Sequence, residues 1–229
     1  MKKFTICAVL AAAAMLSGAK ASASVFEAND NSLSIRPVLS LDITCPGDTK
    51  IDDLLKLDAF KSGAGLSFGA VVDVPVWMNM YLESGLKFYY HTAKYNKDFF
   101  DIAFDDDDLK PSSGSIREFG VSIPVLVGYH FDFDPVRLHV FTGPEFNIGF
   151  SGKEHLNYTV SNHKVSESES IYDDLRRGDV AWVIGAGVQY ERAMFTISAH
   201  PGMVNWSKND GMHLDRTNVD LGISYFFNL

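Results

Sequence analysis

The chain has 229 residues, of which 46% are hydrophobic and 21% are charged, and its formal net charge is −9. Such an acidic chain is a poor ligand for nucleic acid, because that binding needs clustered cations that displace counterions. The only cysteines are Cys7 and Cys45 and no C-x-x-C pair occurs, so neither a disulfide framework nor a thiolate metal site is predicted.

The N-terminal segment has the pattern of a secretory signal peptide. A basic start precedes an apolar run from Phe4 to Leu16, and two Ala-x-Ala sites follow it. The run is too short for a membrane-spanning helix. We expect residues 1–23 to be a signal peptide that is cleaved after Ala21 or Ala23. Its removal takes away three lysines and no acid, so the formal charge falls to −12, and Cys45 is the one cysteine that remains.

Eight later segments alternate between apolar and polar residues. Alternation with a period of two predicts strands with one apolar and one polar face. Each segment is about long enough to cross a bilayer as a tilted strand, which takes roughly 9–11 residues. In chain order the segments are Leu33–Asp42, Gly63–Val76, Met80–His91, Arg117–Phe131, Val136–Phe150, Val180–Tyr190, Met194–Val204 and Asp220–Leu229.

The connections between these segments alternate between long and short. The short ones are residues 77–79, 132–135 and 191–193, and the long ones are roughly 43–62, 92–116, 151–179 and 205–216. Outer-membrane barrels have tight periplasmic turns and longer external loops. The alternation therefore predicts such a barrel, with both chain termini on the periplasmic side.

Aromatic residues gather at both ends of the predicted strands. Near the short turns lie Trp77, Tyr129, Phe131, Tyr190, Phe195, Tyr225 and Phe227, and near the long loops lie Phe60, Tyr90, Phe119, Phe150, Trp182 and Trp206. Two such bands match the interfacial girdles of a membrane barrel. Aromatics could also fill a soluble core. A soluble barrel would then turn its charged faces outward and its apolar faces inward, and the girdles and the loop asymmetry favour the membrane barrel.

The last strand carries a pattern typical of barrel assembly. Asp220, Gly222, Tyr225 and Phe227 fit a polar-x-Gly-x-x-Φ-x-Φ signal that bacterial assembly machinery reads, although Leu229 stands at the usual final Phe. We therefore expect an all-β fold, an eight-stranded antiparallel up-and-down transmembrane β-barrel over residues 33–229. It would have short periplasmic turns and long external loops, and it would be integral to the bacterial outer membrane.

Six short motifs in order resemble the PorT-like outer-membrane β-barrel family, over residues 33–229. They are Ser34-Ile35-Arg36-Pro37, Gly69-Ala70-Val71-Val72-Asp73-Val74-Pro75, Tyr81-Leu82-Glu83-Ser84-Gly85-Leu86, Ile123-Pro124-Val125-Leu126, Phe141-Thr142-Gly143-Pro144 and Gly185-Ala186-Gly187-Val188-Gln189-Tyr190. The resemblance implies an eight-stranded barrel and brings no catalytic residues with it.

The polar strand faces carry a set of charges that a barrel would enclose. They are Arg36, Asp73, Glu83, Lys87, Glu118, Arg137, Glu145 and Asp220, with His130, His139 and His200 beside them. An unpaired buried charge is costly, and eight strands leave an interior only wide enough for side chains. We expect these groups to form a salt-bridged lumen, and a proton- or ion-conducting path is the alternative.

Other polar clusters give weak signals. The acidic run Asp105–Asp108 could bind calcium, but it lacks the alternating spacing and the glycine of a calcium loop, which favours a solvated loop. Ser166–Ser170 is predicted to be a polar external loop. Histidines 91, 155, 163 and 213 lie in or near loops, where histidines beside acids are expected by chance in so acidic a chain. We expect no metal, no cofactor and no catalysis.

The functional expectation is a structural or surface-binding barrel of the cell surface. Its expected partners are outer-membrane lipid and the barrel assembly machinery, with no nucleic acid, and we expect a monomer. An outer-membrane transport, ligand-binding or secretion-accessory barrel is the first alternative. An outer-membrane hydrolase is the second.

Overall fold

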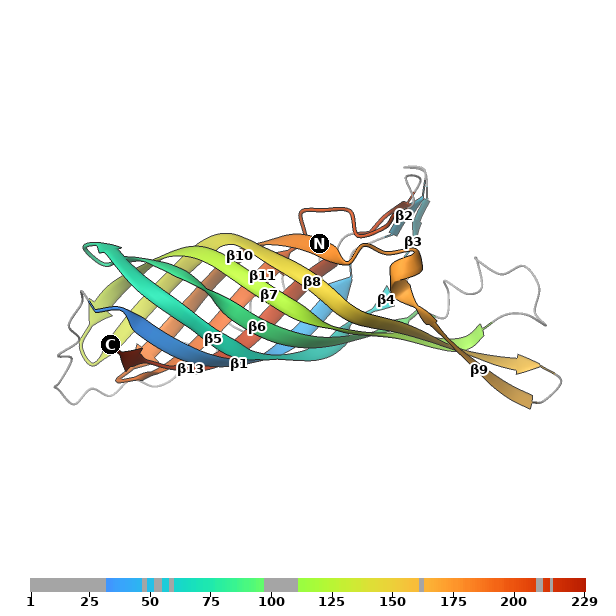
Figure 1. Ribbon diagram of the computed structural model, residues 1–229, viewed down its shortest axis with the longest axis horizontal. Helices are drawn as coiled ribbons and strands as arrows, with labels where there is room; N and C mark the ends of the chain where they lie inside the picture. Colours follow the sequence, from blue (N-terminus) through green and yellow to red (C-terminus); the bar gives the residue numbers. More distant parts are fainter. Residues whose placement is uncertain are drawn as a thin grey trace.

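The computed structural model describes residues 32–46, 49–51, 55–57, 60–96, 111–160, 163–208, 212–214 and 216–229. Eight antiparallel strands close into a ring, drawn lengthwise in Figure 1. In chain order they are β1 (Ser34–Pro46), β5 (Gly63–Trp77), β6 (Met80–Tyr95), β7 (Pro111–Phe133), β8 (Val136–Val160), β10 (Gly178–Tyr190), β11 (Ala193–Pro201) and β13 (Arg216–Tyr225). The pairing of β13 with β1 closes the ring, which confirms the predicted eight-stranded barrel.

The strand faces separate by polarity, as the alternation predicts. On β1, Leu39 and Leu41 are 49% and 62% exposed, whereas Ser40 and Asp42 between and beside them are buried. The same alternation runs along the other strands, so the outside of the ring is apolar and most inward positions are polar. In the described part of the chain no helix is long and apolar enough to cross a membrane.

Three tight turns lie at one end of the barrel, on the left of Figure 1, and the C-terminus lies there too. They join β5 to β6, β7 to β8 and β10 to β11. In the last of them Glu191 has a φ of 52°, the left-handed conformation that tight hairpin turns require. The short strand β14 (Phe227–Asn228) pairs with Ser34 and Ile35 and so extends the closing seam to this end.

The opposite end is longer and more folded than the sequence predicts. Strands β7 and β8 run on beyond the ring, and β9 (His163–Ser170) pairs with β8, so that a three-stranded sheet projects on the right of Figure 1. Around it lie β4 (Phe60–Lys61), which pairs with β6, the 3-10 helix η1 (Ile171–Asp173), and a small sheet of β2 (Thr49–Ile51), β3 (Leu55–Leu57) and β12 (Met212–His213). The prediction of a loop at Ser166–Ser170 was wrong, since these residues belong to β9. Asp105–Asp108 lies outside the described residues.

Candidate functional site: the barrel lumen and its outer mouth

The lumen near the tight turns is filled by one guanidinium and its partners. The Arg36 side chain is buried and donates to both carboxylate oxygens of Asp73, at 3.1 Å from Nη2 to Oδ1, and also to Glu83. Arg36 further donates to Ser224 Oγ at 3.0 Å, and its guanidinium lies 4.9 Å from the ring centroid of Phe226. Four strands, β1, β5, β6 and β13, thus meet at one cation.

The middle of the lumen holds a chain of alternating basic and acidic groups. Lys87 Nζ lies 2.7 Å from Glu145 Oε2, and Glu145 Oε1 lies 2.9 Å from Nδ1 of His200. The other nitrogen of His200, Nε2, lies 3.2 Å from Asp220 Oδ2. All four side chains are largely buried, so this chain ties β6, β8, β11 and β13 together across the barrel.

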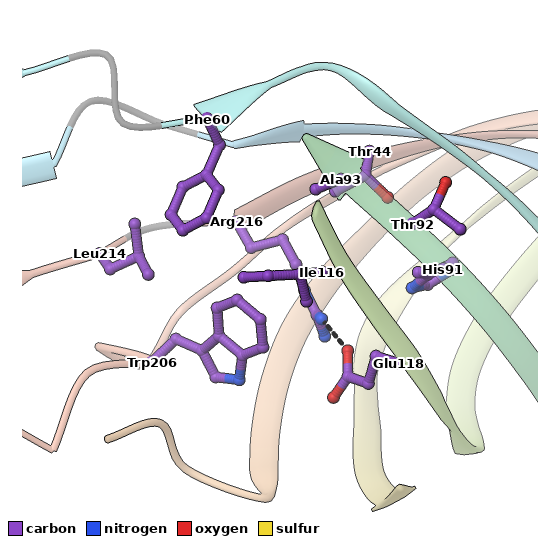
Figure 2. A pocket seen from close by; sticks show the side chains of 10 residues that line it. All are labelled: Thr44, Phe60, His91, Thr92, Ala93, Ile116, Glu118, Trp206, Leu214 and Arg216. Carbon is purple, nitrogen blue, oxygen red and sulfur yellow. Dashed lines mark hydrogen bonds and ion pairs between the residues drawn. The ribbon is translucent and has the colours of Figure 1, made fainter. Parts of the chain in front are cut away.

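The outer third of the lumen is organised around Arg216. This side chain donates to Glu118, as the dashed line in Figure 2 marks, and to Asp179 at 3.3 Å. Glu118 also accepts hydrogen bonds from the hydroxyls of Tyr89 and Tyr172, at 3.3 and 3.2 Å. Burial raises the pKa of Tyr172, and the neighbouring Glu118 carboxylate raises it further, so the Tyr172 hydroxyl keeps its proton and remains a donor.

Apolar side chains also enter the lumen, against the simple rule of an apolar outside and a polar inside. Leu126, Phe141 and Val183 form a buried cluster from three adjacent strands. Val71 and Met194 are fully buried and border the same region. The cavity between this cluster and the charged groups has a volume of about 40 Å³, which holds a few water molecules at most. The lumen of the described barrel is therefore a packed interior and not a pore.

A hydrophobic cluster closes the outer mouth. Its buried members are Ile116, Ile171, Tyr172, Trp206 and Leu214, with Phe60, Tyr95 and Leu175 packed against it. Figure 2 shows Trp206 beside Ile116, and the Trp206 ring lies 4.7 Å from the guanidinium carbon of Arg216. The cavity under this cluster has about 30 Å³, far below the roughly 300–1,000 Å³ of ligand pockets.

The structure places most of the predicted charge network inside the lumen. Seven of the predicted residues are inward and buried or nearly so, namely Arg36, Asp73, Glu83, Lys87, Glu118, Glu145 and Asp220. Arg137 also faces inward, and its side chain is 11% exposed, but it lies at the tight-turn end and pairs with Asp132, whose side chain is 47% exposed. It therefore lies where the lumen meets the tight-turn rim.

Sequence reasoning missed four members of the buried network, Asp42, His91, Asp179 and Arg216. His91 Nε2 lies 3.2 Å from Asp42 Oδ2, and Arg216 holds Asp179. Arg216 was assigned to a loop because the last strand was predicted to begin at Asp220. The signal was present nonetheless, since positions 216, 218, 220, 222 and 224 share the inward parity and are all buried.

Two aromatic residues of the predicted outer girdle do not face lipid. Phe60 and Trp206 belong to the cluster at the mouth, where Trp206 is 8% exposed. Tyr90, Phe119, Phe150 and Trp182 are exposed on the outer surface, as are all seven aromatics predicted for the opposite band. In the predicted assembly signal, Tyr225 and Phe227 face outward with ring centroids 5.0 Å apart, while Asp220 and Gly222 face the lumen.

One arrangement has the hydrogen bonds of a hydrolase triad. Ser198 Oγ lies 2.9 Å from Nε2 of His200, and Nδ1 of His200 lies 2.9 Å from Glu145. Serine hydrolases orient their histidine in this way, but they expose the nucleophile beside a substrate cleft. Here Ser198 is buried, and the adjoining cavity has room only for water. Within the described ranges, no group of three or more potential ligands is placed to hold a metal ion.

Comparison with known proteins gives a family match. A family model described as outer membrane protein beta-barrel domain matches residues 40–201. Among solved structures, the chain is similar to Ail of Yersinia pestis in complex with the heparin analogue sucrose octasulfate, with 16% identity, coverage of 86% of this chain and 99% of that one, and a TM-score of 0.40. It is also similar to OprG from Pseudomonas aeruginosa, with 14% identity, coverage of 86% and 97%, and a TM-score of 0.43. AlkL in lipid bilayers shares 14% identity over 92% and 98% of the two chains, with a TM-score of 0.43. No curated protein matches the chain.

Proposed function

The chain belongs to the outer membrane protein beta-barrel domain family, is an integral outer-membrane β-barrel, and from that premise we propose a non-conducting, non-catalytic barrel with a structural or surface-binding role. The filling of the lumen carries this proposal. Ion pairs around Arg36, Lys87 and Arg216 lie in succession along the barrel, and apolar side chains fill the space between them. A solute would have to break these contacts to pass.

The outer end supports the binding part of the proposal. Strands β7, β8 and β9 form a folded sheet beyond the ring, and η1 and the mouth cluster brace its base. A rigid projecting sheet can present a surface at low entropic cost, because its backbone is already ordered before a partner arrives. The same feature favours a ligand-binding barrel as the second candidate.

Several finer points belong to the same proposal. The six motifs from Ser34 onward support a PorT-like relationship within the broader family. We infer that residues 1–23 are a cleaved signal peptide, that the barrel domain spans 33–229, and that the assembly machinery recognises the terminal strand. We further infer a monomer, because the ring closes on itself and leaves no unpaired barrel edge.

Reconstitution separates the alternatives. Purified mature protein in planar bilayers should give no steady conductance, since about 40 Å³ of lumen space admits only water. Steady single-channel currents would overturn the closed-lumen proposal and favour transport. Turnover of phospholipid or peptide substrates that is lost in Ser198→Ala would favour the hydrolase. Ser198→Ala is a sharp test because Ser198 contacts Nε2 of His200, whose Nδ1 contacts Glu145.

A further inference from the structure

The outward face of the external rim carries five exposed cations on adjacent elements. They are Lys61 on β4, Lys94 on β6, Arg117 on β7, Lys153 on β8, and Arg177 just before β10, and we call them the outer cationic rim. In the described ranges none of the five forms an ion pair with a carboxylate. For a chain with a formal charge of −9, a row of unpaired cations on one face is unexpected.

The pairing register places these cations against one another. Arg117 lies directly opposite Lys153, and Lys61 lies directly opposite Lys94. Like charges directly opposite on neighbouring strands destabilise a sheet. Two such pairs on adjoining strands therefore lower the stability of the folded protein unless an anion lies between the cations.

The row sits at the level of lipid headgroups. Tyr90 lies opposite Phe119, and Phe119 lies opposite Ser151. The ring centroids of Phe119 and Phe150 are 6.1 Å apart. Arg117 lies two residues before Phe119 on the same face, about 7 Å nearer the external end along a strand at 3.3–3.4 Å per residue. Aromatic rings mark the boundary of the hydrocarbon, so cations at this distance above them face the phosphates of the outer leaflet.

A bulge in β8 builds this arrangement. The register passes from Phe119 opposite Ser151 to Gly120 opposite Gly149, so Phe150 is an extra residue in β8. Below the bulge the outward positions of β8 are even, as in Phe146 and Ile148, and above it they are odd. Bulges re-aim side chains in this way. If the alternation ran unbroken through Phe150, Lys153 would be an inward position.

An open groove adjoins the two cations nearest the bulge. Its volume is about 250 Å³, and it is lined by Lys153, Arg177, Tyr172, Phe150, Glu169 and serine hydroxyls. The guanidinium of Arg177 lies 4.4 Å from the centroid of the Tyr172 ring and donates to the Phe150 carbonyl at 3.2 Å, so its position is fixed. Glu169 is the acid of this lining. It pairs with Glu154, so these two carboxylates share the face of the extension opposite to that of Lys153.

We propose that the outer cationic rim binds the phosphate groups of outer-leaflet glycolipid, with the Lys153–Arg177 groove receiving one phosphorylated headgroup. Phosphate oxygens would lie between Arg117 and Lys153 and cancel their repulsion, and Phe150 would contact the top of an acyl chain. The assignment rests on the long-connection end being the external one. It is independent of whether the lumen conducts, which a current measurement decides separately.

The test uses mature protein folded in dodecyl maltoside micelles, with lipid A added as the phosphorylated probe. Bisphosphorylated lipid A should remain bound in native mass spectrometry and raise the thermal midpoint of the folded band, and dephosphorylated lipid A should do neither. Lys153→Gln should weaken retention about tenfold, as loss of a charge-assisted contact does. Lys153→Arg should retain lipid A, and Arg192→Gln, which removes an exposed cation at the opposite rim, should leave retention unchanged.

The sign of the stability change gives a second readout. In lipid-free micelles Lys153→Gln should raise the thermal midpoint, because it relieves the repulsion of Arg117, and with lipid A it should lower the midpoint. A lower midpoint under both conditions would mark Lys153 as a structural residue and overturn the proposal. Equal retention by Lys153→Gln and the natural chain would do the same. If inorganic phosphate stabilises the protein as well as lipid A does, the assignment to a lipid is wrong.

Discussion

Replacing Arg216 by glutamine tests whether the outer third of the lumen is dry. The change removes the cation shared by Glu118 and Asp179, whose side chains are 3% and 6% exposed. Removing one member of a buried ion pair typically costs about 3–5 kcal/mol, because a charge is left buried without compensation. Glu118 keeps its hydrogen bonds from Tyr89 and Tyr172, so we expect a loss near the lower limit, about 3 kcal/mol.

The assay is urea-induced unfolding of the barrel in lipid vesicles, followed by loss of the fast-migrating folded band on unboiled gels. Arg192→Gln is the matched control, and as an exposed turn substitution it should change the free energy of unfolding by no more than about 0.5 kcal/mol. Adding Glu118→Gln to Arg216→Gln should restore roughly 1 kcal/mol or more, because the double variant leaves one buried charge fewer.

A loss below about 1 kcal/mol, which is the range of solvent-exposed pairs, would refute this reasoning. It would mean that water reaches both carboxylates beneath Trp206. Strict additivity of the two substitutions would contradict the direct contact between Arg216 and Glu118.

Three further outcomes follow from the same structure. Val125 lies mid-strand on the outer face of β7, and changing it to Arg should lower the free energy of unfolding in bilayers by about 2–4 kcal/mol, whereas Leu should lower it by under about 1.5 kcal/mol. Equal stabilities in urea titrations would mean that this face does not meet lipid. Deletion of Tyr225–Leu229 removes β14 and the end of β13, so the truncated chain should be exported but absent from the outer membrane as a heat-modifiable species, and its presence there would contradict the closing role of this strand. Burial raises the pKa of Glu154, and repulsion from Glu169 and Asp174 adds to the shift. Because the folded pKa then lies above the unfolded one, the β8–β9 hairpin should become more stable as the pH falls from the folded pKa to the unfolded pKa. Glu154→Gln should give the same protection at neutral pH in hydrogen exchange of the β9 amides, and unchanged exchange would show that this charge does not strain the hairpin.

The ring itself was predictable because a membrane strand must alternate along its whole length. Lipid on one side and enclosed charge on the other leave few exceptions to a period of two. The exceptions that exist come from contacts between strands. Leu126 and Phe141 take inward positions where they pack on Val183 of β10, the neighbour of β8 in the ring, and no pattern within β7 or β8 alone reports that contact.

The outer end was predictable only in part, because alternation loses its meaning where no lipid is present. The Ser-Glu repeat of β9 has no apolar face and therefore resembles a solvated loop, yet β8 supplies a continuous pairing partner. Phe60 and Trp206 were misassigned for a related reason. An aromatic residue near a strand end can mark a headgroup boundary or cap a mouth, and the difference lies in where its loop folds back.

The enclosed charges also explain how one register is selected. A one-residue slip between neighbouring strands transfers every side chain to the opposite face. Such a slip would place Lys87 or Arg36 in lipid, at about 2–4 kcal/mol for a cation at the bilayer midplane, and would strand its former partners in the lumen. Since the partners of Arg36 lie on β5, β6 and β13, a slip at any one of these strands breaks the same cluster. The network thus stabilises the native barrel less through the strength of each pair than through the penalty it imposes on every alternative pairing. A barrel with one selected register holds its external surface in one arrangement. If the lumen charges were removed to let solutes pass, the penalty against the alternative registers would be lost with them.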